Sequence, residues 1–185
     1  MAPGTHLLIS WLSSVEFLKN RRERTLVTLS GVAPDLDGLG LAVDWVTGTT
    51  ELYSKYHHYL GHGFMFSVTL SLFSMVLARV QRIRVFILTF FVVNLHVLCD
   101  VIGSRGPDGY QWPIYYLYPF NNDFELVWSG QWELNAWQNQ VILVLLMSFC
   151  VFYAATRKIS FFEVIHPRLD KEAFDMYDRY IRKKA

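Results

Sequence analysis

The sequence has few of the features that mark a disulfide-rich secreted protein or a nucleic-acid-binding protein. Only two cysteines occur in 185 residues, Cys99 and Cys150. They lie far apart in apolar runs, so neither a disulfide framework nor a cysteine metal site is indicated. The formal net charge is only +1, which gives no polyanion-binding surface and excludes nucleic acid from the expected partners. No charged segment followed by a cleavage site opens the chain, so we expect the N-terminus to be retained.

Hydrophobic residues, by contrast, are abundant. They make up 52% of the chain, aromatic residues make up 16%, and the mean hydropathy is +0.23. This composition is too apolar for an ordinary soluble domain of this size. Apolar runs at residues 64–80 and 85–102 are separated by a tight basic turn, and a third run covers residues 141–156. The first two are each long enough, or nearly so, to cross a hydrocarbon core of about 30 Å as a helix. The third is shorter but gains length from Trp137 at one end and from Arg157 and Lys158 at the other, which we interpret as interfacial anchors.

The remaining segments predict partial or surface helices. Residues 7–18 and 26–43 are apolar but interrupted by polar residues, Gly31 and Pro34, which indicates partial or re-entrant helices. Residues 103–138 are rich in Gly, Pro, Trp and Tyr and predict an ordered extramembrane loop. The fold expected is therefore an all-α integral membrane protein with about three transmembrane helices, N-terminal partial or re-entrant helices and a C-terminal amphipathic helix. We expect a membrane-embedded domain over residues 1–158 and a cytoplasmic amphipathic tail over residues 159–185.

The basic residues predict the orientation in the membrane. Residues 19–24 and 79–84 form two basic turns, and the C-terminus is also basic. These segments fall on one side of the predicted helices, which the positive-inside rule places in the cytoplasm. The loop at residues 103–138 is then extracytoplasmic. We expect a protein of the cytoplasmic (inner) membrane whose active site faces outward.

Histidines and aspartates gather on the predicted extracytoplasmic side. Within a helix, residues four apart share a face, so His58 with His62, and His96 with Asp100, predict two ligand pairs. Mixed imidazole and carboxylate ligands favour zinc, with Mn or Fe as alternatives, over Ca or Mg. The inventory is large enough for one or two divalent ions with a bridging carboxylate. The predicted ligands are His6, Asp35, Asp37, His58, His62, His96 and Asp100.

Each of these signals has a simpler alternative. The histidine pair could pack at the lipid headgroups without a metal, and Asp35 and Asp37, following Pro34, could serve as a helix cap and turn residues. His57 is interpreted as a neighbour of the site rather than a ligand. An acid at the edge of an apolar span, such as Asp100, is costly unless it is paired or ligated.

Short motifs in the chain resemble a known family. They are Thr5-His6, the run from Ala33 to Asp37 (APDLD), His58 with His62, His96 with Asp100, Trp112-Pro113 and Pro119-Phe120. Their order and spacing resemble the YdjM-type family of LexA-regulated, membrane-bound metal-dependent hydrolases. The likeness covers roughly residues 1–120, and the later apolar run fits the family's extra membrane helix. The family is distantly similar to the zinc-dependent phospholipase C and single-strand nuclease superfamily, which implies phosphoester hydrolysis.

The hypothesis that follows is a membrane-bound hydrolase whose metal ions activate water. Because the site is expected at headgroup depth, the predicted partners are membrane lipid and a lipid-phosphate or other phosphoester substrate. Asp37 and Arg105 are the predicted catalytic residues, Arg105 by binding a phosphate bidentately, although a solvated loop arginine is the alternative.

Rival functions stay open from the sequence. A divalent-metal transporter would use similar His/Asp pairs, but its site should lie near the bilayer midplane. A non-catalytic metal-binding membrane scaffold would need closed coordination. An intramembrane metalloprotease is disfavoured because Tyr59 stands where the catalytic Glu of a helical zinc motif would be.

Overall fold

The computed structural model describes residues 1–180, and within them the chain is all-helical without a strand. The elements are α1 (Pro3–Val15), α2 (Arg21–Ser30), η1 (Ala33–Leu39), α3 (Gly40–Thr47), α4 (Leu52–Tyr56), α5 (Phe64–Leu77), α6 (Arg82–Gly103), α7 (Trp137–Arg157), η2 (Phe161–Val164) and α8 (Pro167–Tyr180), where η marks a 3₁₀ helix. The predicted all-α fold is confirmed. The part of the predicted tail at 181–185 lies outside the described residues.

Two helices are long and apolar enough to cross a membrane. They are α6, with 22 residues, and α7, with 21 residues. Helix α5 has only 14 residues and spans about 21 Å at 1.5 Å per residue, so the expected count of about three spans is not confirmed. The α5 helix ends because Ala78 adopts an extended conformation, and buried Glu23 accepts hydrogen bonds from the Arg79 and Val80 backbone N–H groups.

The second partial helix expected near the N-terminus is a bent element. Helix α2 and the η1–α3 segment differ in direction by 44°, and together they are apolar enough to form a broken span or a re-entrant loop. The break lies at Gly31 and Val32, just before Pro34 of η1. Proline cannot continue a helical hydrogen-bond ladder, and the tighter 3₁₀ turn carries the chain from α2 into α3.

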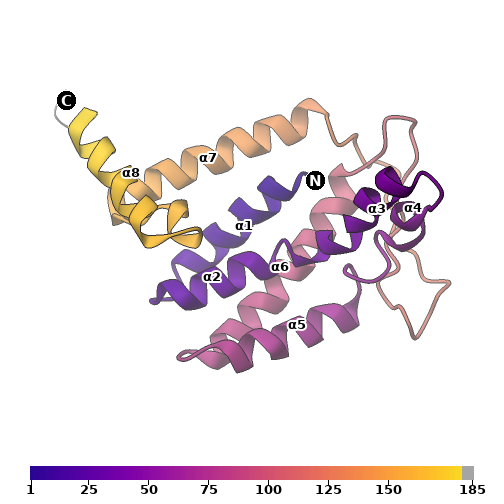
Figure 1. Cartoon of the computed structure of the whole chain (residues 1–185), viewed down its shortest axis with the longest axis horizontal. Helices are drawn as coiled ribbons and strands as arrows, with labels where there is room; N and C mark the ends of the chain where they lie inside the picture. Colours follow the sequence, from indigo (N-terminus) through magenta and orange to yellow (C-terminus); the bar gives the residue numbers. More distant parts are fainter. Residues whose placement is uncertain (181–185) are drawn as a thin grey trace.

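Helices α1, α2, α5 and α6 pack side by side into a bundle (Figure 1). A buried apolar cluster of Leu18, Val27, Ala78, Val85 and Val92 joins α2 to the α5–α6 turn and α6. Both basic turns lie at the same end of the bundle as α8, whereas α3, α4 and the long loop lie at the opposite end (Figure 1). Burial of this cluster fixes the position of α6 along the bundle axis relative to α2. It therefore also fixes the position of the polar residues near the other end of α6.

The C-terminal segment is tied to the bundle by a buried ion pair. Arg24 donates to both carboxylate oxygens of Glu163, at 2.6 and 2.5 Å, and Trp11 Nε1 donates to Glu163 at 3.0 Å. Val164 packs against Trp11 and Val15. The first residues of the predicted tail therefore contact α1 and α2.

The loop between α6 and α7 is ordered by local pairing, as its composition predicted. Isolated bridges join Arg105 to Glu133 and Ile114 to Leu126, and Ile114 is fully buried. The Gln131 side-chain amide donates to the Asp100 carbonyl at 2.8 Å. The loop is therefore attached directly to the end of α6 that carries Asp100.

Candidate metal centre

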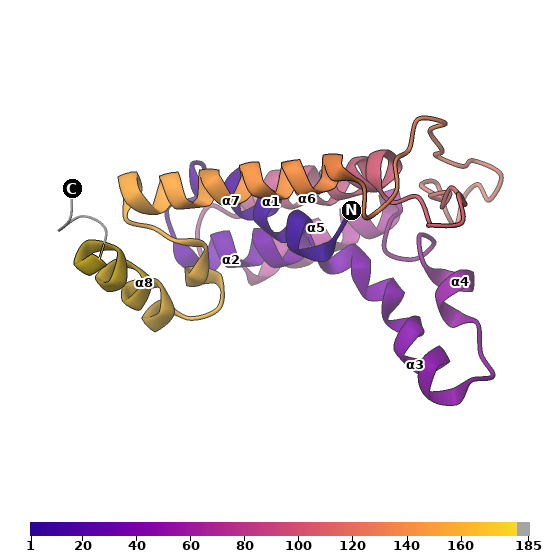
Figure 2. The ribbon, with the colours of Figure 1, turned by 90° about the horizontal axis from the view of Figure 1, so that it is seen from above.

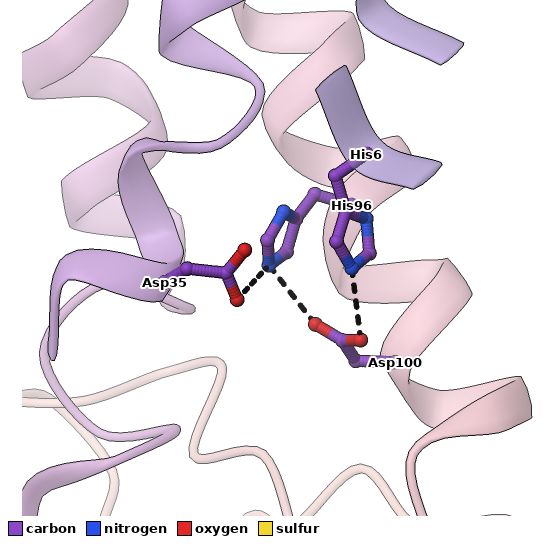
Figure 3. Close-up of side chains that lie close together, drawn as sticks. All are labelled: His6, Asp35, His96 and Asp100. Atoms are coloured by element: carbon purple, nitrogen blue, oxygen red, sulfur yellow. Dashed lines mark hydrogen bonds and ion pairs between the residues drawn. The ribbon is translucent and has the colours of Figure 1, made fainter. Parts of the chain in front are cut away.

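One group of potential ligands joins three elements at the end of the bundle opposite α8. His6 of α1, Asp35 of η1, and His96 and Asp100 of α6 place ligand atoms within 4.8 Å of one another. His96 Nε2 lies 2.9 Å from Asp100 Oδ2 and 3.6 Å from Asp35 Oδ1, and His6 Nε2 lies 3.2 Å from Asp100 Oδ1 (Figure 3). The expected helical spacing of His96 and Asp100 is confirmed, since both belong to α6.

A second group shares Asp100 with the first. Ligand atoms of His58, His62 and Asp100 also lie within 4.8 Å of one another, and His62 Nε2 is 3.4 Å from Asp100 Oδ2. The sequence predicted His58 and His62 on one helical face, and this is wrong: both lie in the segment between α4 and α5, and His58 has a φ of 69°. The left-handed turn brings the two rings to a centroid separation of 4.5 Å instead.

Hydrogen bonds on the far side of two rings fix their orientation. His96 Nδ1 lies 2.8 Å from the Gly31 carbonyl oxygen, to which it can only donate. His62 Nδ1 lies 2.9 Å from Asp37 Oδ2. In both rings Nε2 then points to the shared site, and the two Nε2 atoms are 3.2 Å apart. Metal-binding histidines commonly donate their other ring N–H to a carbonyl or carboxylate in this way.

Asp37 orients residues of the site through hydrogen bonds. It lies outside both ligand groups and accepts hydrogen bonds from the His57 and His62 side chains and from the His58 and Gly61 backbone N–H groups. In a 3₁₀ helix of three residues per turn, positions two apart point in different directions. Asp35 therefore faces His96, whereas Asp37 faces the segment between α4 and α5. His57 contacts Asp37 at 2.8 Å and is also outside both groups.

The electrostatics of the site favour a cation. Burial lowers the pKa of His62, but hydrogen bonds to Asp100 and Asp37 outweigh it and raise the pKa to about 9. The His62 ring thus lies between two carboxylates, with Nδ1 at Asp37 and Nε2 at Asp100, and a metal ion could replace the proton on Nε2. The Met1 ammonium also contacts Asp100 Oδ1. Burial, together with the neighbouring His62 and His57, holds the pKa of His58 well below its usual range, which keeps its ring neutral.

The donor set fits a divalent metal. Buried His6 Nδ1, His58 Nδ1 and Asp35 Oδ2 have no hydrogen-bond partner, and such atoms are costly to bury unless something binds them or the groups they belong to. His62 is fully buried and Asp100 is 2% exposed. Two groups that share one carboxylate can hold one ion or two, and neutral imidazoles with carboxylates suit zinc and related metals.

An open cavity of about 580 Å³ leads to these groups. Its lining includes Asp35, His58 and Asp100, and Arg105 at the start of the loop. Arg105 Nη2 lies 3.8 Å from Glu133 Oε1, and its buried Nε has no partner. Arg105 therefore lines the same cavity as three members of the ligand groups, and its guanidinium has one donor without a partner.

Several contributors to the site were not predicted from the sequence. The Gly31 carbonyl orients His96, and Tyr53, Leu39 and Trp112 line the cavity. Trp112 was noted only as part of a motif, although its ring packs edge-on against His57 and His58. A backbone carbonyl carries no residue-type signal, so Gly31 could not have been found by pattern alone.

A family model described as YdjM inner membrane protein matches residues 1–164 of the chain. This range includes both ligand groups, the cavity and the Glu163 ion pair. No curated protein and no solved structure matches the chain significantly.

Proposed function

Because the chain belongs to the YdjM inner membrane protein family, we propose that it is a metal-dependent hydrolase that cleaves a phosphoester of a lipid or another membrane-proximal substrate. The observation that carries the proposal is Asp100. This single buried carboxylate belongs to both ligand groups and lines an open cavity. A closed structural site would have no such access.

The residues divide into ligands and supports. His6, Asp35, His58, His62, His96 and Asp100 would hold the metal, zinc being our first choice with Mn or Fe as alternatives. A bound divalent metal would supply a Lewis acid and activate water near neutral pH. Asp37 positions His62 and the backbone of its loop. That role replaces direct ligation as our assignment for Asp37.

Arg105 provides the contact with substrate in this proposal. Arg105 lines the cavity with Asp35 and Asp100, and its ion pair with Glu133 is long at 3.8 Å. A guanidinium fork binds phosphate oxygens bidentately. Arg105 would therefore hold the phosphoryl group against the metal centre and neutralise charge that builds up on its oxygens.

The place of the centre supports a substrate at the membrane surface. Asp100 lies within one turn of the C-terminal end of α6, at Gly103, so the centre sits near one end of a candidate span. We place this end on the extracytoplasmic side because both basic turns lie at the other end. A transport site would be expected nearer the middle of a span.

The proposal is tested with purified protein loaded with Zn²⁺ or Mn²⁺ and assayed against bis(p-nitrophenyl) phosphate. We expect hydrolysis that Arg105→Ala lowers by about 10²–10³-fold, the usual cost of losing a donor to transition-state charge, while metal content stays unchanged. Arg84→Ala is the matched control, because Arg84 is an exposed arginine at the other end of α6. Stoichiometric metal without turnover of any phosphoester would contradict hydrolysis and favour a metal-binding scaffold.

A further inference from the structure

Helix α3 is apolar, and apart from its contacts with the adjacent η1 and α4 its surface is uncovered in the described part of the chain. None of its eight residues is buried, and the exposed fractions are 58% for Leu41, 86% for Trp45 and 76% for Val46. The α3–α4 segment projects sideways from the bundle (Figure 2). Contiguous exposed apolar surface on this scale marks a contact with a membrane or another molecule.

The charges near α3 fit contact with lipid. Residues 25–54 contain no Lys or Arg, and residues 36–50 contain only Asp37 and Asp44 as charged residues. Asp44 accepts hydrogen bonds from Thr50 Oγ1 and from the Leu52 and Tyr53 backbone N–H groups, at 2.6 to 2.8 Å. Both carboxylate oxygens of Asp37 likewise have hydrogen-bond partners within the site, the side chains of His57 and His62. Neither acid therefore presents an unpaired carboxylate to a bilayer.

The position of α3 also points to a bilayer. It lies at the same end of the molecule as the end of α6 and the start of α7 (Figures 1 and 2), and these two helices are the candidate spans. A lipid leaflet around them is therefore adjacent to α3. Exposed Trp45 is of the residue type enriched where the hydrocarbon meets the headgroups.

The apolar surface of α3 continues into the cavity of the metal centre. Leu39, the last residue of η1, is 62% exposed and also lines the cavity, next to Gly38 and Tyr53. The polar part of the same cavity contains Asp35, Asp100 and Arg105. An amphiphile with its phosphate at Arg105 could therefore leave its acyl chains along Leu39 and α3.

We infer that α3 inserts into the leaflet nearest the metal centre and that a phospholipid reaches the cavity sideways from this leaflet, past Leu39. The inference rests on the proposed function for the identity of the reaction, but the contact of α3 with lipid does not depend on turnover. The occupant of the apolar face is thus the acyl region of a phospholipid bilayer rather than a second protein chain.

The lipid contact is tested by spin labelling in phosphatidylethanolamine and phosphatidylglycerol vesicles. A nitroxide is attached to Val46→Cys, and to Asp108→Cys as a control in the exposed loop, with Cys150→Ser so that Cys99, a buried thiol, is the only other cysteine. We expect the label at position 46 to collide with oxygen and to be shielded from a water-soluble paramagnetic reagent, with the opposite result at position 108. A label at position 46 that is equally open to the aqueous reagent, or that is shielded in detergent-solubilised dimers only, would overturn the inference.

The substrate route is tested with Leu41→Asp/Val46→Asp, two changes outside the cavity lining, against Val127→Asp, an exposed apolar loop position. The double variant should keep its metal and its hydrolysis of bis(p-nitrophenyl) phosphate but lose about tenfold or more of its hydrolysis of vesicle phospholipid, because charges on the apolar face oppose insertion. Equal losses on both esters, or no selective loss on the lipid, would overturn the route. Absence of turnover by the wild type would instead contradict the proposed function, while the spin labels would still decide whether α3 contacts lipid.

Discussion

At the scale of single residues, the site consists of candidate ligands and of groups that fix the orientation of those ligands. His62 and His96 each use Nδ1 for a partner outside the ligand groups, Asp37 and the Gly31 carbonyl respectively. Fixing the ring in this way leaves Nε2 as the ligand atom without an entropic cost at the moment of binding. The same division explains why two aspartates only two positions apart, Asp35 and Asp37, have different roles.

This division predicts graded effects on metal affinity. Asp37→Asn should weaken metal binding about 10–100-fold, as expected for the loss of a group that orients a ligand, whereas His62→Ala should remove a ligand and lower the metal content itself. Competition titration of each purified variant with a chromogenic chelator measures the difference. Equal loss in the two variants would mean that Asp37 binds the metal directly, as the sequence suggested.

The residue types of the site could be predicted, but part of their geometry could not. Spacing identified His96 and Asp100 correctly because a long apolar helix keeps its period over the whole span. The same rule failed for His58 and His62, because the chain turns through a positive φ at His58 and the segment between α4 and α5 is not helical. Four-residue spacing cannot distinguish a helix from a compact turn of this kind.

At the scale of helices and loops, the length of the hydrophobic runs predicted the positions of the two long helices best. The runs expected at residues 85–102 and 141–156 lie within α6 and α7, which extend up to four residues further at either end. Helix α5 ends at Leu77, before the end of the apolar run at residues 64–80. Its end lies there because Glu23, a buried acid on α2, accepts hydrogen bonds from the backbone N–H groups of Arg79 and Val80. That interaction comes from packing between distant segments, so the apolar run alone could not reveal it.

The buried pair of Arg24 and Glu163 should dominate the attachment of the C-terminal segment. Glu163→Ala leaves the buried Arg24 without its carboxylate, with only the Leu18 and Lys19 carbonyls as acceptors among the described residues, and we expect a loss of about 3–5 kcal/mol of stability. The matched control is Glu16→Ala, which removes an exposed pair with Arg157 and should cost about 0–1 kcal/mol. Thermal unfolding in detergent measures both, and equal shifts in Tm would show that the pair does not anchor the segment.

At the scale of the whole molecule, charge separates the two ends. The basic turns and α8 lie at one end of the bundle, and the metal centre, α3 and the long loop lie at the other (Figure 1). Positive segments resist translocation across the inner membrane. Helix α6 thus connects a basic end of the bundle with the end that carries the candidate metal ligands.

This separation predicts the orientation of the protein. In intact spheroplasts, Asp108→Cys should react with a membrane-impermeant maleimide, whereas Lys171→Cys in α8 should react only after lysis. The background thiols Cys99 and Cys150 lie on α6 and α7 and are not fully exposed. The reverse pattern would place the metal centre in the cytoplasm and would redirect the search for its substrate to that side.

The central claim is that Asp100 organises a metal centre, and metal analysis of the purified protein tests it most directly. Wild type, Asp100→Asn and Asp123→Asn are purified without added chelator, and their Zn, Mn and Fe contents are measured by mass spectrometry. Asp123 is an exposed acid in the loop between α6 and α7, so its substitution controls for loss of charge alone. We predict one or two ions per chain in wild type and Asp123→Asn and almost none in Asp100→Asn, because both ligand groups share this carboxylate. Equal metal content in all three proteins, or none in wild type even after incubation with these metals, would contradict the account.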